Sequence, residues 1–197
     1  MIDYIFPLII YVFIAAITPG PNNTMAFYNS FNFGIRKSLH LPIAASLGTT
    51  IIQLACCFGL GSILIKFPMI QNILKFIGCT YLIYLSYQIA ILKLSNNKYD
   101  VKKISFLEYF LFQFINPKTL IFASSTSIIF TNYSYNFIFE TIIISSVMGI
   151  LTIIGISTWI FAGNILLNIF TDNFQRKITN YFLSFCLLIT AIWIVFT

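Results

Sequence analysis

Charged residues are scarce in this chain. Only 8% of its 197 residues are Asp, Glu, Lys or Arg, and it has one histidine. Hydrophobic residues make up 59% of the chain, and the mean hydropathy is +0.92. About a quarter of the residues of an ordinary soluble domain are charged, so this composition excludes that class. Apolar runs of spanning length fill almost the whole chain, which predicts one all-α integral membrane domain over residues 1–197.

The groups that catalysis and metal binding need are missing from the apolar runs. Asp3, Glu108, Glu140 and Asp172 all fall at the ends of predicted spans or in connections. There is no Walker loop, no pair of catalytic carboxylates and no Ser/His/Asp set. The net charge of +6 comes from short connections, which indicates membrane topology and not a nucleic-acid partner. We therefore expect a protein that is not an enzyme and needs no cofactor or metal ion.

What the chain does contain is a series of membrane-length apolar segments. Hydropathy predicts six transmembrane helices, at about 4–26, 41–64, 69–92, 106–130, 137–162 and 177–196.

Basic residues are concentrated in every second connection between these spans: Arg36 and Lys37, then Lys93, Lys98, Lys102 and Lys103, then Arg176 and Lys177. The remaining connections and the termini hold Lys66, and also Lys75 if it is counted there. The positive-inside rule then predicts that the odd-numbered connections are cytoplasmic and that both termini are outside.

The first apolar stretch is too long to be one straight helix. It runs from Tyr4 to Ile35 without a charge and would reach about 48 Å, beyond a hydrocarbon core of about 30 Å. The run Thr18, Pro19, Gly20, Pro21 and Asn22 predicts a break, because two prolines remove backbone donors and glycine permits unusual dihedrals. In transporters, such breaks mark substrate sites.

A second break is predicted in the fourth span, at Asn116, Pro117 and Lys118. Pro117 follows Pro19 by 98 residues, about half of the 197-residue chain. Adding 98 to the second span, 41–64, gives 139–162, which overlays the fifth. Each half holds three spans, an odd number, so the halves (about 1–95 and 104–197) must enter the membrane in opposite directions. This arithmetic predicts two inverted three-helix repeats, a layout common among secondary transporters.

The two breaks predict an anion-binding site near the middle of the membrane. Each proline opens a new helical segment, so we expect unpaired N–H groups at Asn22, Asn23, Thr24, Lys118 and Thr119. Helix N-termini bind carboxylates, and Lys118 adds a full positive charge at the same depth. Two alternatives stay open here: the prolines are kinks absorbed by packing, or Lys118 clamps carbonyls freed at the break, such as that of Gln113.

Three further side chains are candidates for lining this site. Lys75 lies about 9 Å into the third span and would either line the site or extend to the outer interface. Tyr81 would either line a cavity or pack against its neighbours. Gln53 is a lone polar residue in the second span, where a helix–helix hydrogen bond is the alternative role.

Three motifs in this order resemble the LysE/RhtB-type amino-acid exporters. The run from Thr18 to Asn22 is similar to the T-P-G-P signature of the family's first helix, and Gly34-x-Arg36 follows as in the family. The segment from Lys75 to Leu85 is similar to its K-x-x-G-x-x-Y-L pattern, and residues 116–118 match its N-P-K. These motifs cover the first four spans; the fifth and sixth agree in hydropathy and position.

The resemblance implies a small exporter of amino acids in the bacterial inner membrane, driven by an ion gradient and not by ATP. Its partners would be the amino acid, membrane lipid and a coupling ion, proton or sodium, and a homo-oligomer is compatible with it. Many relatives have Asp where this chain has Asn22, so the resemblance does not extend to the coupling ion or to cationic substrates. Because no carboxylate lies deep in a span, we expect a neutral, zwitterionic substrate.

The cysteines support one alternative of a different class. Cys56, Cys57, Cys79 and Cys186 lie in predicted spans with the spacing of neither a disulfide framework nor a metal site. A six-span thiol–disulfide carrier would need two accessible cysteines whose Cα atoms come within about 7 Å. The two broken spans contain none, so amino-acid export is the preferred hypothesis.

Overall fold

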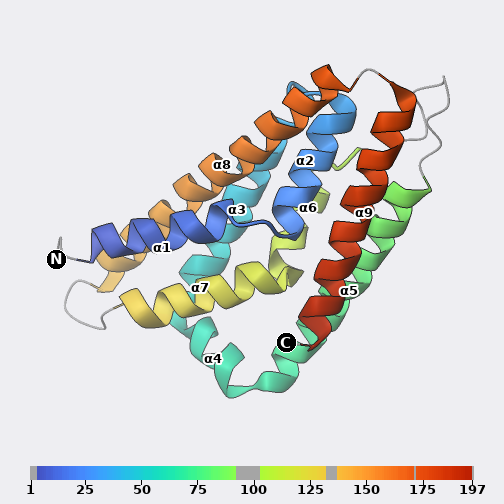
Figure 1. The fold of residues 1–197 in the computed structure, drawn as a ribbon. Coiled ribbons are helices and arrows are strands. Elements are labelled where there is room, and N and C mark those ends of the chain that lie inside the picture. The colour runs from blue at the N-terminus through green and yellow to red at the C-terminus, as the bar shows by residue number, and fades with distance from the viewer. Residues whose placement is uncertain (1–3, 92–102, 132–136, 171, 197) are drawn as a thin grey trace.

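The computed structural model describes residues 4–91, 103–131, 137–170 and 172–196, most of them helical (Figure 1). In chain order the helices are α1 (Ile5–Ile17), α2 (Pro21–Phe33), α3 (His40–Ala55), the π-helical η1 (Cys56–Leu60), α4 (Gly61–Lys66), α5 (Pro68–Ala90), α6 (Phe106–Ile115), α7 (Pro117–Phe130), α8 (Phe137–Ile169) and α9 (Asn173–Phe196). The predicted all-α class is confirmed for these residues. Lys93, Lys98 and Lys102, predicted in the third connection, lie outside them.

Four stretches of the described chain are long and apolar enough to cross a membrane: His40–Lys66, Pro68–Ala90, Phe137–Ile169 and Asn173–Val195. Helices α1 and α2 form a fifth when they are taken as one span bent by 53°. Helix α6 is a shorter apolar helix that leads directly into α7. The described residues therefore contain four or five candidate spans by length and composition, and the predicted count of six requires α6 and α7 to be counted together.

Large apolar side chains cover the outside of the helix bundle. Phe6, Phe58, Phe76 and Trp193 have exposed fractions of 71%, 65%, 73% and 69%. Soluble proteins seldom expose so many large apolar side chains, whereas a bilayer solvates them. This surface agrees with a multi-pass membrane protein.

Both predicted helix breaks are present. Thr18 has ψ 133°, the extended conformation that a following proline favours, and it ends α1. Gly20 is extended, and Pro21 is the first residue of α2, where a missing N–H costs no hydrogen bond. At the second break Asn116 separates α6 from α7, and Pro117 begins α7 in the same way.

Three predicted boundaries are wrong. Helix α2 continues to Phe33 instead of ending near residue 26, and α8 continues to Ile169 instead of residue 162. Helix α9 begins at Asn173, so Arg176 and Lys177 lie within it and not in a connection. Hydropathy detects contact with lipid and not the helix itself, so it misses helical turns that are polar or lie beyond the hydrocarbon core.

Helix α2 is a polar helix enclosed by the others, which explains why hydropathy underestimates it. The hydroxyl of Ser30 donates to the carbonyl of Ile160 on α8 at 2.7 Å. The amides of Asn32 and Asn180 exchange hydrogen bonds of 3.0 and 3.1 Å between α2 and α9. Because protein and not lipid surrounds α2, its polar groups find the partners that a bilayer cannot offer.

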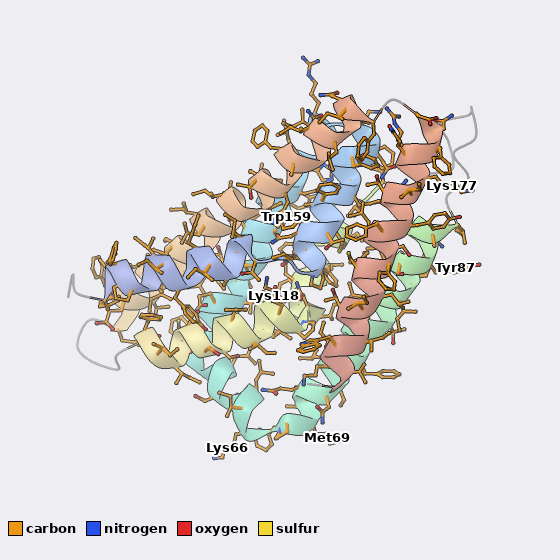
Figure 2. The ribbon with its side chains drawn as sticks, in the orientation of Figure 1. Lys66, Met69, Tyr87, Lys118, Trp159 and Lys177 are labelled. Atoms are coloured by element: carbon orange, nitrogen blue, oxygen red, sulfur yellow. The ribbon has the colours of Figure 1, made fainter. Side chains whose placement is uncertain are left out.

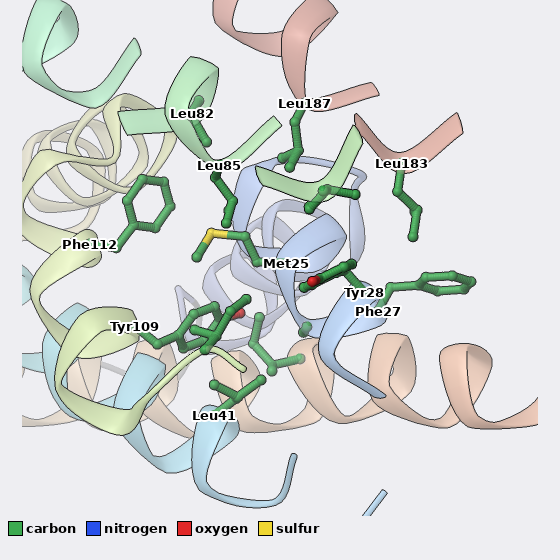
Figure 3. Close-up of a cluster of buried hydrophobic side chains, with 14 of the residues drawn as sticks. Met25, Phe27, Tyr28, Leu41, Leu82, Leu85, Tyr109, Phe112, Leu183 and Leu187 are labelled. Carbon is green, nitrogen blue, oxygen red and sulfur yellow. The ribbon is translucent and has the colours of Figure 1, made fainter. Parts of the chain in front are cut away.

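The apolar side chains of α2 belong to a large buried cluster (Figure 3). The cluster joins α2 to α3, α5, α6 and α9 through side chains that include Met25, Tyr28, Leu41, Leu82, Leu85, Tyr109, Phe112, Leu183 and Leu187. This packing fixes the start of α2 relative to α6.

Helices α5 and α9 lie side by side along one edge of the molecule (Figure 1). They are joined by a reciprocal contact: the Ser86 hydroxyl donates to the Ser184 carbonyl at 2.9 Å, and the Ser184 hydroxyl donates to the Ser86 carbonyl at 2.8 Å. The two serines are 98 residues apart, the same separation as Pro19 and Pro117.

Candidate functional site

The side chain of Lys118 connects the two helix breaks (Figure 2). Its ammonium donates to the carbonyl of Thr18 at 2.7 Å and lies 3.4 Å from the carbonyl of Pro19. Carbonyls at the C-terminus of a helix carry partial negative charge, so the end of α1 complements this cation. Lys118 does clamp freed carbonyls, but those of the opposite break and not that of Gln113. An ammonium has three donors, so these contacts leave one for a ligand.

Gly20 lets the lysine cross between the breaks. A Cβ atom on Gly20 would lie 2.9 Å from Cδ of Lys118, closer than real Cβ atoms approach their neighbours. Gly20 and Lys118 are also 98 residues apart, so the positions that correspond in the predicted repeat are in contact.

Asn23 holds the end of α1 against the start of α2. Its side-chain amide donates to the carbonyls of Ala16 at 2.9 Å and Thr18 at 2.8 Å, and the residue is 4% exposed. The Thr18 carbonyl therefore accepts from both Asn23 and Lys118.

Asn22 joins the first break to α6. Its amide donates to the Gln113 side chain at 2.7 Å and accepts from it at 3.1 Å, so the two amides form a closed pair. The Tyr109 hydroxyl donates to the Asn22 carbonyl at 2.8 Å, and the Thr119 hydroxyl lies 3.4 Å from Gln113 Oε1. These bonds fix the first turn of α2 against the second break.

The two helix starts differ, which corrects part of the expectation that both present free N–H groups. At α7 the side chain of Asn116 accepts from the backbone N–H of Lys118 at 3.1 Å, so this donor is capped. At α2 the backbone N–H of Thr24 already bonds to the Gly20 carbonyl at 2.9 Å. Gly20 has no side chain to cap Asn22 or Asn23, so α2 provides the stronger anion-binding end.

A cavity of about 60 Å³ lies where these groups meet. It is lined by Val12, Ala15, Ala16, Gly20, Asn22, Asn23, Thr49, Asn116, Lys118, Thr119, Phe122, Met148, Thr152 and Ile156. A cavity needs at least about 10–15 Å³ to hold one water, so this one has room for several waters or a small ligand. Its lining combines one cation with hydroxyls, amides and apolar walls, and includes no carboxylate. Glu140, which is buried to 5% exposure in the first turn of α8, is not part of it.

Comparison with known proteins agrees with this arrangement. Residues 13–196 match the family described as LysE type translocator, which is nearly the whole chain. The chain belongs to this family. A translocator moves a solute across a membrane and is not an enzyme, so the predicted family and the predicted lack of enzymatic activity are both confirmed.

The chain is also similar in sequence to individual proteins, two of them from Salmonella paratyphi A and Escherichia coli. The chain is 28% identical over 174 residues to a protein of Salmonella paratyphi A named cysteine/O-acetylserine efflux protein. The matched region covers 87% of this chain and 84% of that relative. The chain is 27% identical over 160 residues to an Escherichia coli protein of the same name. Here the matched region covers 81% of this chain and 82% of that relative. No solved structure matches the chain.

Three of the predicted site residues, Lys75, Tyr81 and Gln53, lie away from the cavity. Lys75 lines a different, smaller cavity. The Tyr81 hydroxyl donates to the Glu108 carboxylate at 2.7 Å, and its ring packs on Phe112 with centroids 5.0 Å apart. Gln53 is fully buried, and its amide lies 3.4 Å from Cys57 Sγ within α3 and η1. These three residues therefore do not line this cavity, and a role for them in substrate binding stays a prediction.

The predicted residues of the two breaks do come together, with some at the lining and others behind it. Gly20, Asn22, Asn23, Asn116 and Lys118 line the cavity. Thr18, Pro19, Pro21 and Pro117 shape the breaks without lining it, and Thr18 and Pro19 contribute through their carbonyls.

The sequence reasoning missed several members of the site. Gln113 is the one polar side chain in the second half of α6, beyond Glu108 and Tyr109 of the first turns, so its isolation could have identified it. Thr49 and Thr152 hydrogen-bond to one another at 3.2 Å between α3 and α8 and both line the cavity. Threonine is common in membrane helices, so their sequence offers no comparable signal.

Proposed function

We propose that this translocator is a secondary exporter of a small, neutral, zwitterionic amino acid, which binds in the cavity between the two helix breaks. The observation that carries the proposal is the convergence of Lys118, the uncapped start of α2 and the carbonyl end of α1 on one small cavity. In this arrangement the ammonium and the N–H groups of Asn22 and Asn23 bind the substrate carboxylate. Helix-end carbonyls and the threonine hydroxyls accept hydrogen bonds from its ammonium.

The lining of the cavity favours a neutral substrate. A second positive charge on the substrate would lie beside Lys118 with no carboxylate in the lining to compensate, and an unpaired buried charge costs several kcal/mol. The cavity of about 60 Å³ is small, which favours a substrate with a small side chain. Cysteine and O-acetylserine, the substrates in the names of the relatives, are small and carry no net charge, so they are the first candidates here.

The architecture that we propose has six spans in two inverted three-helix repeats. It counts α1 with α2, and α6 with α7, as broken spans. The reciprocal Ser86 and Ser184 contact and the Gly20 and Lys118 contact support it, because both join residues 98 apart, and equivalent residues of two repeats meet where they lie close to a pseudo-twofold axis. We further propose that the protein lies in the bacterial inner membrane with both termini outside, as the distribution of basic residues predicts.

Transport in this proposal is driven by an ion gradient. A proton and a sodium ion both remain candidates for the coupling ion, and a homo-oligomer is compatible with the exposed apolar surface. The thiol–disulfide alternative receives no support from the family match. The thiols of Cys56, Cys57 and Cys79 are also buried, where a redox partner cannot reach them.

The test is transport by the purified protein in liposomes. Radiolabelled cysteine under reducing conditions, O-acetylserine, alanine, lysine and aspartate would be loaded and their efflux measured under imposed proton or sodium gradients. We expect efflux of the small neutral amino acids, dependent on one of the two gradients, and little efflux of lysine or aspartate. Preferential efflux of lysine, or none of any amino acid, would contradict the proposal.

A further inference from the structure

A second cavity lies on the opposite face of α7. It has a volume of about 20 Å³ and is lined by Leu64, Gln71, Lys75, Pro117, Leu120, Ile121 and Ser124. Lys118, Thr119 and Phe122 of the same helix face the first cavity. The first turns of α7 therefore lie between the two cavities, and Pro117 at the second break lines the second one.

The second cavity contains a cation without a counter-charge. Lys75 is half-buried in α5, about 10 Å along the helix from Pro68, and makes no hydrogen bond or ion pair with any described residue. An ionisable side chain within a membrane span is costly unless it has a partner or a function. Gln71 lies one turn earlier on the same face of α5, and Ser124 supplies a hydroxyl from α7. An ammonium, an amide and a hydroxyl together present hydrogen-bond donors, which suits an anionic oxygen group.

Helix α4 forms one wall of this cavity, and an irregular helical segment precedes it. Helix α4, which carries Leu64, follows the π-helical η1, where Gly59 has φ +112°. A Cβ atom at Gly59 would meet nothing within 4 Å, so there is free space around the irregular residue. Departures from α-helical geometry of this kind are frequent at functional sites, and free space beside one allows the short helix beyond it to move.

We propose that the second cavity is a carboxylate-binding station on the transport path, with Lys75 as its cation. The substrate carboxylate passes from Lys118 around the start of α7 to Lys75. This cavity, at about 20 Å³, is smaller than the first, and displacement of α4 about Gly59 enlarges it during the transfer. The inference rests on the proposed function, and in the orientation proposed above this station is on the outer side. It assigns Lys75 to release of the substrate and Lys118 to its initial binding.

A lipid phosphate has the same chemistry as a carboxylate, so the test must separate these two sources. The variants are Lys75→Gln, Lys75→Arg and the control Lys66→Gln, which removes an exposed lysine at the end of α4. Equilibrium binding and efflux of radiolabelled cysteine would be measured in vesicles of phosphatidylcholine alone and in vesicles that also contain phosphatidylglycerol.

We expect Lys75→Gln to keep the dissociation constant for cysteine within about twofold and to slow efflux at least about tenfold in both vesicle types. Lys75→Arg should recover part of the rate, and Lys66→Gln should leave it unchanged. Normal efflux by Lys75→Gln would overturn the inference, as would a defect confined to vesicles with phosphatidylglycerol, which would assign the lysine to a lipid headgroup. If wild-type protein moves cysteine and Lys75→Gln does so equally well, only this inference fails; if wild-type protein moves no neutral amino acid, the proposed function fails.

Discussion

At the scale of single residues, Lys118 and the Asn22–Gln113 amide pair join the two helix breaks at the candidate site. Both cross from one helix break to the other, so each has a structural role as well as a candidate binding role. The effect of substituting these residues on transport can therefore be interpreted only if the stability of each variant is measured as well.

Replacement of Lys118 by alanine should weaken binding of a neutral amino acid about ten- to a hundredfold. A charge-assisted hydrogen bond contributes about 1.5–3 kcal/mol, and each 1.4 kcal/mol is a factor of about ten in affinity. Lys118→Arg should recover part of the affinity if charge dominates and little if the small cavity requires the compact ammonium. Binding of radiolabelled cysteine to purified variants with wild-type melting temperatures measures the effect. Normal binding by Lys118→Ala would show that the lysine is only a clamp between the breaks.

The amide pair should behave as a unit. Gln113→Leu leaves both side-chain groups of Asn22 without their partner and should lower the free energy of unfolding by about 1–3 kcal/mol. The double variant Asn22→Leu with Gln113→Leu should lose less than the sum of the two single changes, because neither amide of the pair is then left without its partner. Thermal unfolding of the three variants in detergent provides the comparison. If the changes in the free energy of unfolding of the two single variants add up to that of the double variant, the hydrogen bonds between the two amides contribute nothing to stability.

At the scale of helices, close backbone contacts hold α1 and α2 against α8 and so place the first break. A Cβ atom on Gly155 would lie 2.7 Å from the carbonyl oxygen of Ala16, and one on Gly163 would lie 2.5 Å from that of Phe27. Helices in lipid gain little from hydrophobic burial against one another, so such small-residue contacts contribute much of their association.

Gly155→Ala should therefore displace the end of α1 and lower both stability and substrate affinity. Overpacking of this kind costs about 1–3 kcal/mol, and the displaced carbonyl of Thr18 would no longer meet Lys118 at its present 2.7 Å. The matched control is Ile154→Leu, the neighbouring residue, whose side chain is 42% exposed on the outer surface and should tolerate the change. Melting temperature and cysteine binding are the measurements. Equal values for the two variants would show that α1 tolerates an added methyl group.

At the scale of the whole molecule, two features support the even number of membrane crossings that we propose. Basic residues cluster in alternate connections, and the ends of α2 and α8 gather at one end of the molecule, away from both chain termini (Figure 1). Contacts between residues 98 apart further relate the two halves.

We expect a reporter fused after Thr197 to be outside the cytoplasm. An alkaline phosphatase fusion, which is active only outside, should be active, and a green fluorescent protein fusion should be dark when exported through the general secretion pathway. The same reporters fused within 93–103, in the basic third connection, should give the reverse result and serve as the control. A fluorescent, phosphatase-negative C-terminal fusion would overturn the topology and the even span count.

The sequence by itself determined the helical class, both helix breaks and the family. Proline removes a backbone donor and fixes φ wherever it occurs, so Pro19 and Pro117 end helices without help from distant residues. Low charge and long apolar runs likewise need no tertiary information. The motifs around both prolines and Lys75 pointed to the family that the comparison then confirmed.

Only the tertiary structure decided which residues meet. The acceptors of Lys118 are carbonyls, which every residue has, so no sequence pattern could select Thr18 and Pro19. Lys75 was predicted as a candidate for the same site as Lys118, but it lines the cavity on the other side of α7. The rotation of α5 about its own axis depends on its packing against α9 and not on its own sequence. Helix α2 was predicted too short for the same reason. Its polar turns are stable because the helices packed around it shield them from lipid, and that shielding exists only in the folded protein.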